Sequence, residues 1–204
     1  EADSSGAWQI PDAVSAYPKS FDFDGSNDFI NCGNDSNLRP TTELSLSFWL
    51  NGVGSGNDFV LRNGASSDLS NNYGFGFRVL SSANNYRFVL GNGSANTTLL
   101  VSGVLSGWNH FLCNWDGSTM KLFINGSLAG STSFTGPISY STGNFLIGDR
   151  NTSPSKPYLG KISNVQLFNT ALPATGTDSV ETLYNNGIPL TTAIASDNLK
   201  AWYK

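Results

Sequence analysis

The sequence has little charge. Only 13% of its 204 residues are Asp, Glu, Lys or Arg, which is about half of the usual share. The 11 basic residues form no cluster, and the formal net charge at pH 7 is −4. Because proteins bind nucleic acid through clustered Lys and Arg that neutralise phosphates, we expect no nucleic-acid partner.

Long apolar segments are missing as well. No apolar run approaches the roughly 18 residues that a membrane-spanning helix needs. We therefore expect no membrane insertion. With 39% hydrophobic residues, the chain still has enough apolar side chains for one large domain with its own core.

Residues that bind transition metals are few. The sequence has one histidine, His110, and two distant cysteines, Cys32 and Cys113, so a zinc site is not expected. The two cysteines lie on separate expected strands. A single disulfide in an extracellular domain and two small buried thiols both fit this arrangement, and the sequence does not decide between them.

Short strands and turns dominate what is present. In residues 107–126, apolar and polar residues alternate in two segments that are joined by Asp116-Gly117 and closed by Asn125-Gly126. Asp-Gly and Asn-Gly tolerate the positive φ of tight turns, so this pattern predicts a central β-hairpin. Further strands are expected from alternation or apolar runs at 21–23, 29–30, 44–50, 58–62, 73–79, 86–90, 97–102, 128–134, 144–148 and 159–168.

The number and spacing of these strands indicate the fold class. About a dozen short strands at a spacing of roughly 8 to 12 residues predict an all-β protein with two antiparallel sheets, and a jelly-roll sandwich fits the size better than an immunoglobulin domain. One short helix is expected at 178–185, before Gly187. We divide the chain into a lead-in segment (1–19), the jelly-roll domain (20–190), and a C-terminal strand or the start of a following module (191–204).

Several segments carry a family resemblance. Phe21-Asp-Phe-Asp-Gly-Ser-Asn-Asp-Phe-Ile30, Leu46-Ser-Phe-Trp-Leu50, Gly107-Trp-Asn-His-Phe111, Leu122-Phe-Ile-Asn-Gly126 and Gly160-Lys-Ile-Ser-Asn-Val165 follow one another in order. Their order and spacing resemble laminin-G-like, concanavalin A-like jelly-roll domains. The resemblance implies a curved two-sheet sandwich, often one module of a tandem array on a secreted, cell-surface or virion protein, that commonly binds glycans or proteins.

The concanavalin A-like fold also includes glycoside hydrolases, which need two closely spaced carboxylates. Relatives of that kind carry Glu-x-Asp-x-Glu along one strand, and this motif is absent here. Asp22 and Asp24 share one face of a strand, but solvated or cation-binding carboxylates are the simpler interpretation. His110 lies in an apolar strand and is expected to be structural. We therefore expect no enzymatic activity, and a hydrolase remains the least favoured alternative.

Calcium is the one cofactor that the resemblance suggests, because Ca²⁺ prefers oxygen ligands. Carried over from relatives, the candidate ligands are Asp24, Asp28 and Asn164. Many relatives have Asp-Glu where this chain has Ser163-Asn164. Ordinary turn-capping carboxylates are the alternative.

Glycan recognition combines aromatic and polar side chains on rim loops. The loops at 63–73 and 149–158 supply the candidate ligand-binding residues Asp68, Asn72, Tyr73, Asp149, Arg150 and Tyr158.

Two hypotheses for function follow. The first is a non-catalytic adhesion module in an extracellular, cell-surface or virion-surface setting, which binds glycans or host-surface molecules. The second is a structural decoration, fibre or filament subunit whose partners are copies of itself or other surface proteins.

Overall fold

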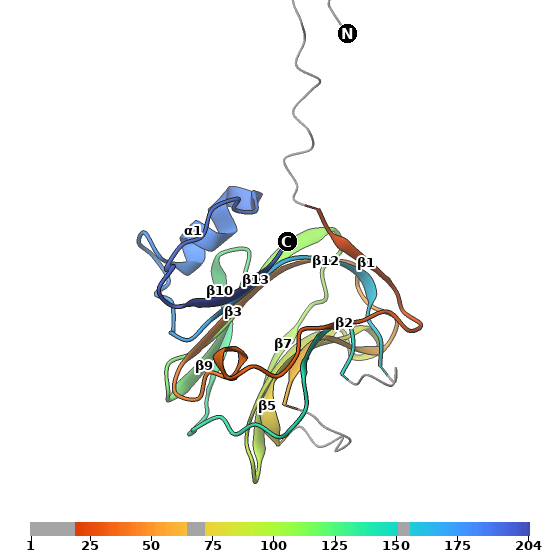
Figure 1. The fold of residues 1–204 in the computed structure, drawn as a ribbon. Coiled ribbons are helices and arrows are strands. Elements are labelled where there is room, and N and C mark those ends of the chain that lie inside the picture. The colour runs from red at the N-terminus through yellow and green to blue at the C-terminus, as the bar shows by residue number, and fades with distance from the viewer. Residues whose placement is uncertain (1–18, 65–71, 151–155) are drawn as a thin grey trace, which may run out of the picture.

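The protein forms a sandwich of two antiparallel sheets (Figure 1). The computed structural model describes residues 19–64, 72–150 and 156–204. The seven-stranded sheet contains, in spatial order, β1 (Phe21–Asp24), β12 (Leu159–Phe168), β3 (Leu44–Asn51), β8 (Trp108–Trp115), β9 (Thr119–Ile124) and β10 (Ser127–Ser133), with β13 (Leu199–Tyr203) also paired to β12. The six-stranded sheet contains β2 (Ile30–Asn31), β11 (Phe145–Ile147), β4 (Asn57–Asn63), β5 (Tyr73–Leu80), β6 (Asn85–Asn92) and β7 (Asn96–Ser102).

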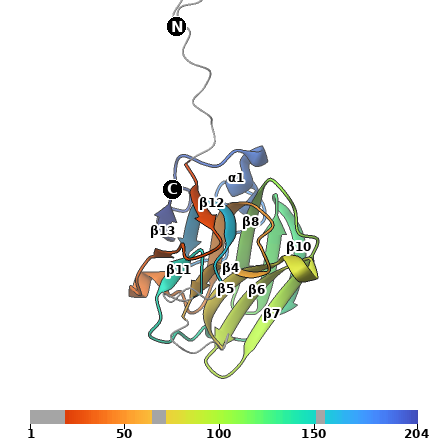
Figure 2. The ribbon, with the colours of Figure 1, turned by 90° about the vertical axis from the view of Figure 1, so that its right-hand side faces the viewer.

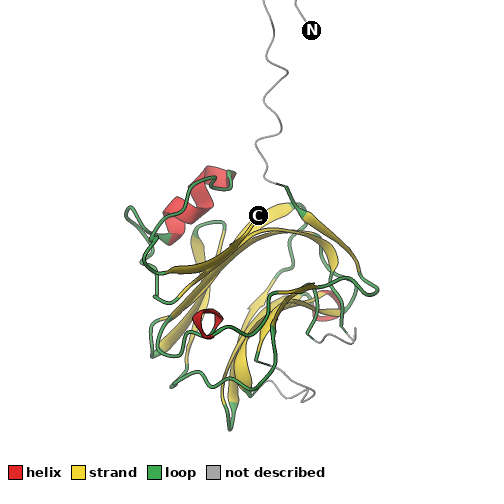
Figure 3. Cartoon of the chain, viewed as in Figure 1, coloured by secondary structure: helices red, strands yellow, loops and turns green. Residues whose placement is uncertain are grey.

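Helical structure is sparse in the described residues, as Figure 3 shows. The single described α-helix is α1 (Val180–Tyr184), and the 3-10 turns are η1 (Ser36–Leu38), η2 (Ser81–Ala83) and η3 (Asn185–Gly187). The expected two-sheet antiparallel jelly roll with one short helix near the C-terminus is therefore confirmed.

The predicted central hairpin is formed by β8 and β9. Trp115 pairs with Met120 at its closed end, where Gly117 takes φ +88°. Asn125 and Gly126 both take positive φ and turn the chain from β9 into β10. These turn residues fix the register, because Asn and Gly adopt the left-handed conformation with little strain.

The main core lies between the sheets and is rich in aromatic residues. Phe48 and Phe111 come from the seven-stranded sheet, and Phe77 and Tyr86 from the six-stranded one. The ring of Phe77 lies 4.9 Å from that of Phe48, and Tyr86 lies 4.7 Å from Phe111, measured between centroids. All four side chains are buried, so period-two alternation gives each sheet one apolar inner face.

The outer face of the seven-stranded sheet is covered by the chain that follows β12. Leu112 and Phe168 on the sheet pack with Leu172, Val180 and Leu183 in a second apolar cluster. Figure 1 shows α1 lying over this sheet, on the side away from the other sheet. A five-residue helix is too short to be stable alone, so packing of this apolar face holds it in place.

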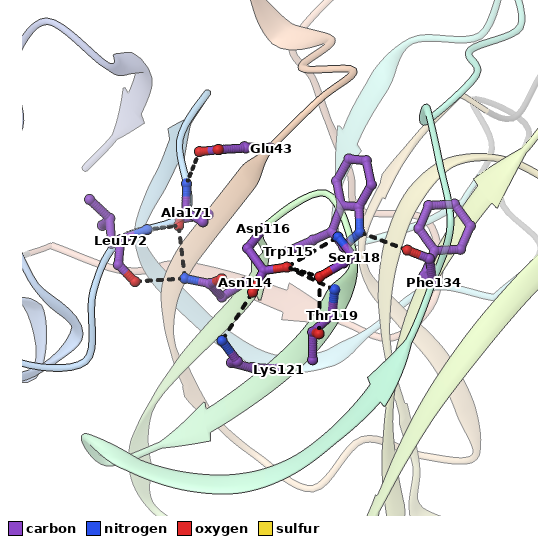
Figure 4. A network of polar contacts seen from close by, with 11 residues as sticks. Glu43, Asn114, Trp115, Asp116, Ser118, Thr119, Lys121, Phe134, Ala171 and Leu172 are labelled. Carbon is purple, nitrogen blue, oxygen red and sulfur yellow. Dashed lines mark hydrogen bonds and ion pairs between the residues drawn. The ribbon is translucent and has the colours of Figure 1, made fainter.

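Polar contacts anchor the start of this covering segment (Figure 4). The Glu43 carboxylate accepts a hydrogen bond from Ala171 N at 3.0 Å, and Asn114 Nδ2 donates to Leu172 O at 2.8 Å. Nearby, Asp116 closes the β8–β9 turn by accepting from Thr119 N at 2.8 Å. Partial burial opposes ionisation of Asp116, but hydrogen bonds from Thr119, Ser118 and Lys121 outweigh it and lower the pKa of the carboxyl.

A bulge interrupts the alternation of β12. Uninterrupted alternation would place Ile162 and Asn164 on one face and Val165 on the other. In the structure the register with β3 shifts between Ser163 and Gln166, and Asn164 takes φ +49°. Ile162 and Val165 therefore both enter the core.

Candidate binding surface

Of the candidates in the first predicted rim loop, Asn72 is engaged in hydrogen bonds and Tyr73 is half-buried. Asn72 donates from Nδ2 to Ser94 O at 3.1 Å and accepts from Asn96 at 2.8 Å, so its amide is occupied by the β6–β7 turn. Tyr73 is half-buried at the start of β5. Asp68 lies outside the described residues.

In the second predicted loop, two of the three candidate ligand-binding residues are buried. Asp149 is fully buried, and its carboxylate accepts from Arg150 N at 2.5 Å and Lys156 N at 3.2 Å. Tyr158 is also fully buried; its hydroxyl donates to Gly52 O at 3.1 Å and its ring contacts Phe23. The expectation that Asp149 and Tyr158 line a rim site is therefore wrong for this structure, because both side chains stabilise the fold from inside.

Arg150, the third candidate in that loop, is half-buried. Its guanidinium carbon lies 5.7 Å from the ring centroid of Phe59. Phe59 pairs with Arg78, five residues beyond Tyr73 on β5 and roughly 17 Å along the strand. The structure therefore separates Tyr73 from Arg150 and does not assemble the six predicted residues into one site.

The residues predicted to bind calcium are not brought together either. Asp24 pairs with Leu159, five residues before Asn164 on β12, which corresponds to roughly 16 Å along the strand. Asp24 accepts from Ser26 N, Asp28 accepts from Asp24 N, and Asn164 accepts from Trp202 Nε1 at 2.8 Å. The two carboxylates cap their own turn. Within the described ranges, no group of three His, Cys, Asp or Glu side chains could hold a metal ion.

Cys32 and Cys113 are both free, so the disulfide alternative does not hold in this structure. Cys113 lies on β8 of the seven-stranded sheet, whereas Cys32 N donates to Phe145 O beside the six-stranded sheet. Burial raises the pKa of the Cys113 thiol well above its usual value. It also raises the pKa of Cys32, and a hydrogen bond with Tyr203 partly offsets that effect.

His110 forms a Ser-His pair with Ser47, an arrangement that occurs in some catalytic sites. Its Nε2 lies 2.8 Å from Ser47 Oγ, and its ring packs against Trp49 and Tyr184. The imidazole is fully buried, which lowers its pKa to about 3, and no described residue bonds its Nδ1. The histidine is therefore neutral and enclosed beneath the covering segment.

The outer face of the six-stranded sheet is buried at β4 and β5 and becomes exposed toward β7. Figure 2 shows β11, β4, β5, β6 and β7 following one another across the molecule. One row across this face consists of Phe59, Arg78, Arg87 and Leu100, each directly opposite the next. Phe59 is buried, Arg87 is half-buried and Leu100 is 49% exposed, so the row opens toward β7. We call these four residues the arginine row.

The two arginines of this row lie opposite each other, and no acid among the described residues forms an ion pair with them. Arg78 donates to the side-chain oxygen of Asn57, and Arg87 Nε donates to Asn85 Oδ1 at 3.2 Å; both acceptors are neutral. Neither arginine forms an ion pair with any residue that the structure describes. Arg78 is only 9% exposed, and its guanidinium carbon lies 4.5 Å from the Phe59 centroid. Burial, together with the charges of Arg87 and Arg150, lowers the pKa of Arg78 to about 10.

The sequence carried part of the signal for this row. Alternation in 73–79 and 86–90 places Arg78 and Arg87 on the face opposite the aromatic residues. Their direct pairing depends on the register of the β5–β6 hairpin, which is set by η2 and by Asn84 at φ +49°. A four-residue connection of this kind has no Asn-Gly or Asp-Gly signal.

A hollow of about 690 Å³ lies between the chain at 170–178 and that at 193–198. Asp178 and Asp197 are among its lining residues, and Asp178 already accepts from Ala195 N at 2.8 Å. The lining contains no aromatic side chain, so it lacks the platform that sugars usually stack on.

Among the helices that the structure describes, none has the length and apolar character of a membrane-spanning segment.

Comparison with known proteins supports the architecture. Residues 24–176 match the family model for the concanavalin A-like lectin/glucanases superfamily. A search of curated proteins found no match.

Solved structures share the fold at low sequence identity. The heptameric SAP-like pentraxin from Limulus polyphemus is 18% identical with a TM-score of 0.60, and the alignment covers 84% of each chain. The binding domain of botulinum neurotoxin serotype D is 17% identical with a TM-score of 0.60, over 84% of this chain and 44% of that one. The binding domain of botulinum neurotoxin DC in complex with rat synaptotagmin II is 18% identical with a TM-score of 0.62, over 86% and 44%. The chain thus spans less than half of these neurotoxin domains.

Proposed function

Because the chain belongs to the concanavalin A-like lectin/glucanases superfamily, we propose that it is a non-catalytic module that binds glycans at a cell or virion surface. The ligand would bind to the outer face of the six-stranded sheet, around the arginine row. The setting in this proposal is extracellular.

The observation that carries the proposal is the difference between the two outer faces. The segment after β12 covers one sheet and buries Leu112 and Phe168. On the other sheet, Asn96, Thr98 and Leu100 of β7 are exposed beside Arg87, which is half-buried. This combination of hydrogen-bonding groups and an apolar side chain suits a sugar, which has both polar hydroxyls and apolar C–H faces.

Structures of similar fold lend further support. One is the binding domain of botulinum neurotoxin DC in complex with SialylT, and another is that domain in complex with rat synaptotagmin II. In those proteins, domains that include this fold bind other molecules. We carry over only the general role, since the identities are 15% and 18%.

The residues that would suggest catalysis make structural contacts or are buried. Asp22 forms an ion pair with Lys161 at 2.6 Å, Asp24 caps a turn, and His110 is buried. These contacts support the non-catalytic part of the proposal.

A glycan array with the purified chain tests this function. We expect wild type to bind at least one class of immobilised glycan. Replacing exposed Leu100 by Glu puts a hydrated charge on the proposed surface and should weaken that binding at least about fivefold, or roughly 1 kcal/mol. The matched control is Leu128→Glu, a similarly exposed leucine on β10 of the other sheet, which should bind like wild type.

Other outcomes would point elsewhere. Absence of glycan binding together with concentration-dependent self-assembly would overturn the proposal and favour a structural subunit. Repeating the array with calcium and then with a chelator tests the calcium expectation, since a calcium-dependent site would lose binding in the chelator.

A further inference from the structure

The arginine row contains an electrostatic conflict that the fold alone does not explain. Arg78 and Arg87 are direct cross-strand partners on β5 and β6. Side chains in such pairs start from Cβ atoms only about 4.5–5.5 Å apart, and like charges placed there are destabilising. The pair therefore costs stability in the free protein.

No acid in the surrounding strands relieves this conflict. The sequence contains 15 Asp and Glu residues, yet none lies between Asp68 and Asp116, a stretch that includes all of β5, β6, β7 and β8. Asp58 on β4 pairs with Val79, whose side chain enters the core, and its carboxylate accepts from Ser55 N at 2.5 Å. An acidic protein thus has a locally cationic surface around Arg78 and Arg87.

The buried member of the pair has an unused donor. Arg78 Nε is inaccessible to solvent and has no hydrogen-bond partner among the residues that the structure describes, and the residue as a whole is 9% exposed. A buried donor without a partner costs free energy, and the cost is larger for a charged group. An incoming anion beside this guanidinium would neutralise charge and accept hydrogen bonds from Arg87, whose side chain is partly accessible.

Resting on the glycan-binding function proposed above, we propose that the ligand is an acidic saccharide, whose carboxylate or sulfate group binds between Arg78 and Arg87. Guanidinium groups bind planar or tetrahedral oxyanions through paired N–H donors, which gives orientation as well as strength. The exposed Leu100 at the end of the row lies where the uncharged part of the sugar would rest.

The test compares three polysaccharides that differ in the charged group they carry. Dextran sulfate carries sulfate esters, polygalacturonate carries carboxylates, and dextran is neutral. Wild type should bind one or both of the acidic polymers at least about tenfold more tightly than dextran, and the acidic polymer that binds identifies the oxyanion. Binding should weaken as NaCl is raised from 50 to 500 mM, because salt screens the attraction.

Variants separate the arginine row from net charge. Arg87→Gln should reduce affinity for the acidic polymer at least about tenfold, and Arg87→Lys should reduce it less, since a lysine keeps the charge but loses the paired donors. Lys161→Gln, on the other sheet, removes the same unit of charge and should change affinity less than about twofold. Arg87→Gln should also melt no lower than wild type, because it removes a repulsion.

The results distinguish this inference from the function on which it rests. If wild type binds dextran as well as the acidic polymers, and Arg87→Gln binds normally, the acidic class is wrong while glycan binding stands. If wild type binds no saccharide, both are wrong. If Arg87→Gln loses binding only because its melting temperature falls, the residue is structural and the inference fails.

Discussion

At the scale of single residues, His110 shows how burial determines ionisation. The imidazole lies beneath Tyr184 and is bonded to Ser47, with no acid among its described contacts. Its pKa of about 3 lies below the ordinary 6.5, so between these values the unfolded chain binds a proton that the folded chain does not. Stability from this residue is complete above about pH 6.5 and is lost as the pH falls toward 3.

This difference predicts a pH dependence of unfolding. Between pH 7 and pH 5, His110 alone should remove about 2 kcal/mol from the free energy of unfolding. His110→Gln keeps a hydrogen-bonding side chain next to Ser47 but has no proton to gain in this range. Urea unfolding at both pH values should therefore show a smaller decrease for the variant, by about 2 kcal/mol. Equal decreases would contradict a buried, neutral histidine.

At the scale of elements, α1 depends on the sheet that it covers. Leu183 is 2% exposed and packs in the cluster with Leu112 and Phe168. Leu183→Ala should lower the free energy of unfolding by about 2–4 kcal/mol, because it removes buried methyl groups and leaves a cavity. Leu128→Ala, at a leucine that is 56% exposed, is the control and should cost less than about 0.5 kcal/mol. Thermal or urea unfolding measures both, and similar losses would mean that α1 is not held by this cluster.

The elements also show what sequence patterns can predict. Alternation predicts the strands because the inner face of each sheet is apolar, and Asp116-Gly117 and Asn125-Gly126 identify the turns of the central hairpin. The bulge at Asn164 left no such signal, since it arises from pairing with β3, far away in the sequence. The sequence predicts Asp149 and Tyr158 at the surface because polar and loop-borne side chains are usually exposed, whereas the structure buries both and their hydrogen bonds are made inside.

At the scale of the whole molecule, the first and last described strands lie next to each other on one edge of β12. β1 and β13 both pair with β12, on the edge that β3 leaves free. Phe21, near the start of β1, is opposite Ile162, and Tyr203, near the end of β13, is opposite Val165. These two positions on β12 are three residues apart, which is roughly 10 Å.

That proximity makes the sandwich a candidate for circular permutation. Lys204 could be joined to Lys19 through a few glycine and serine residues, and the chain reopened between Thr175 and Gly176, in an exposed loop. We expect the permuted protein to give a β-sheet circular dichroism spectrum and a cooperative unfolding transition. A permuted chain without such a transition would contradict the expectation. Because β1 and β13 meet on β12, the packing of the two sheets should not depend on where the chain is opened.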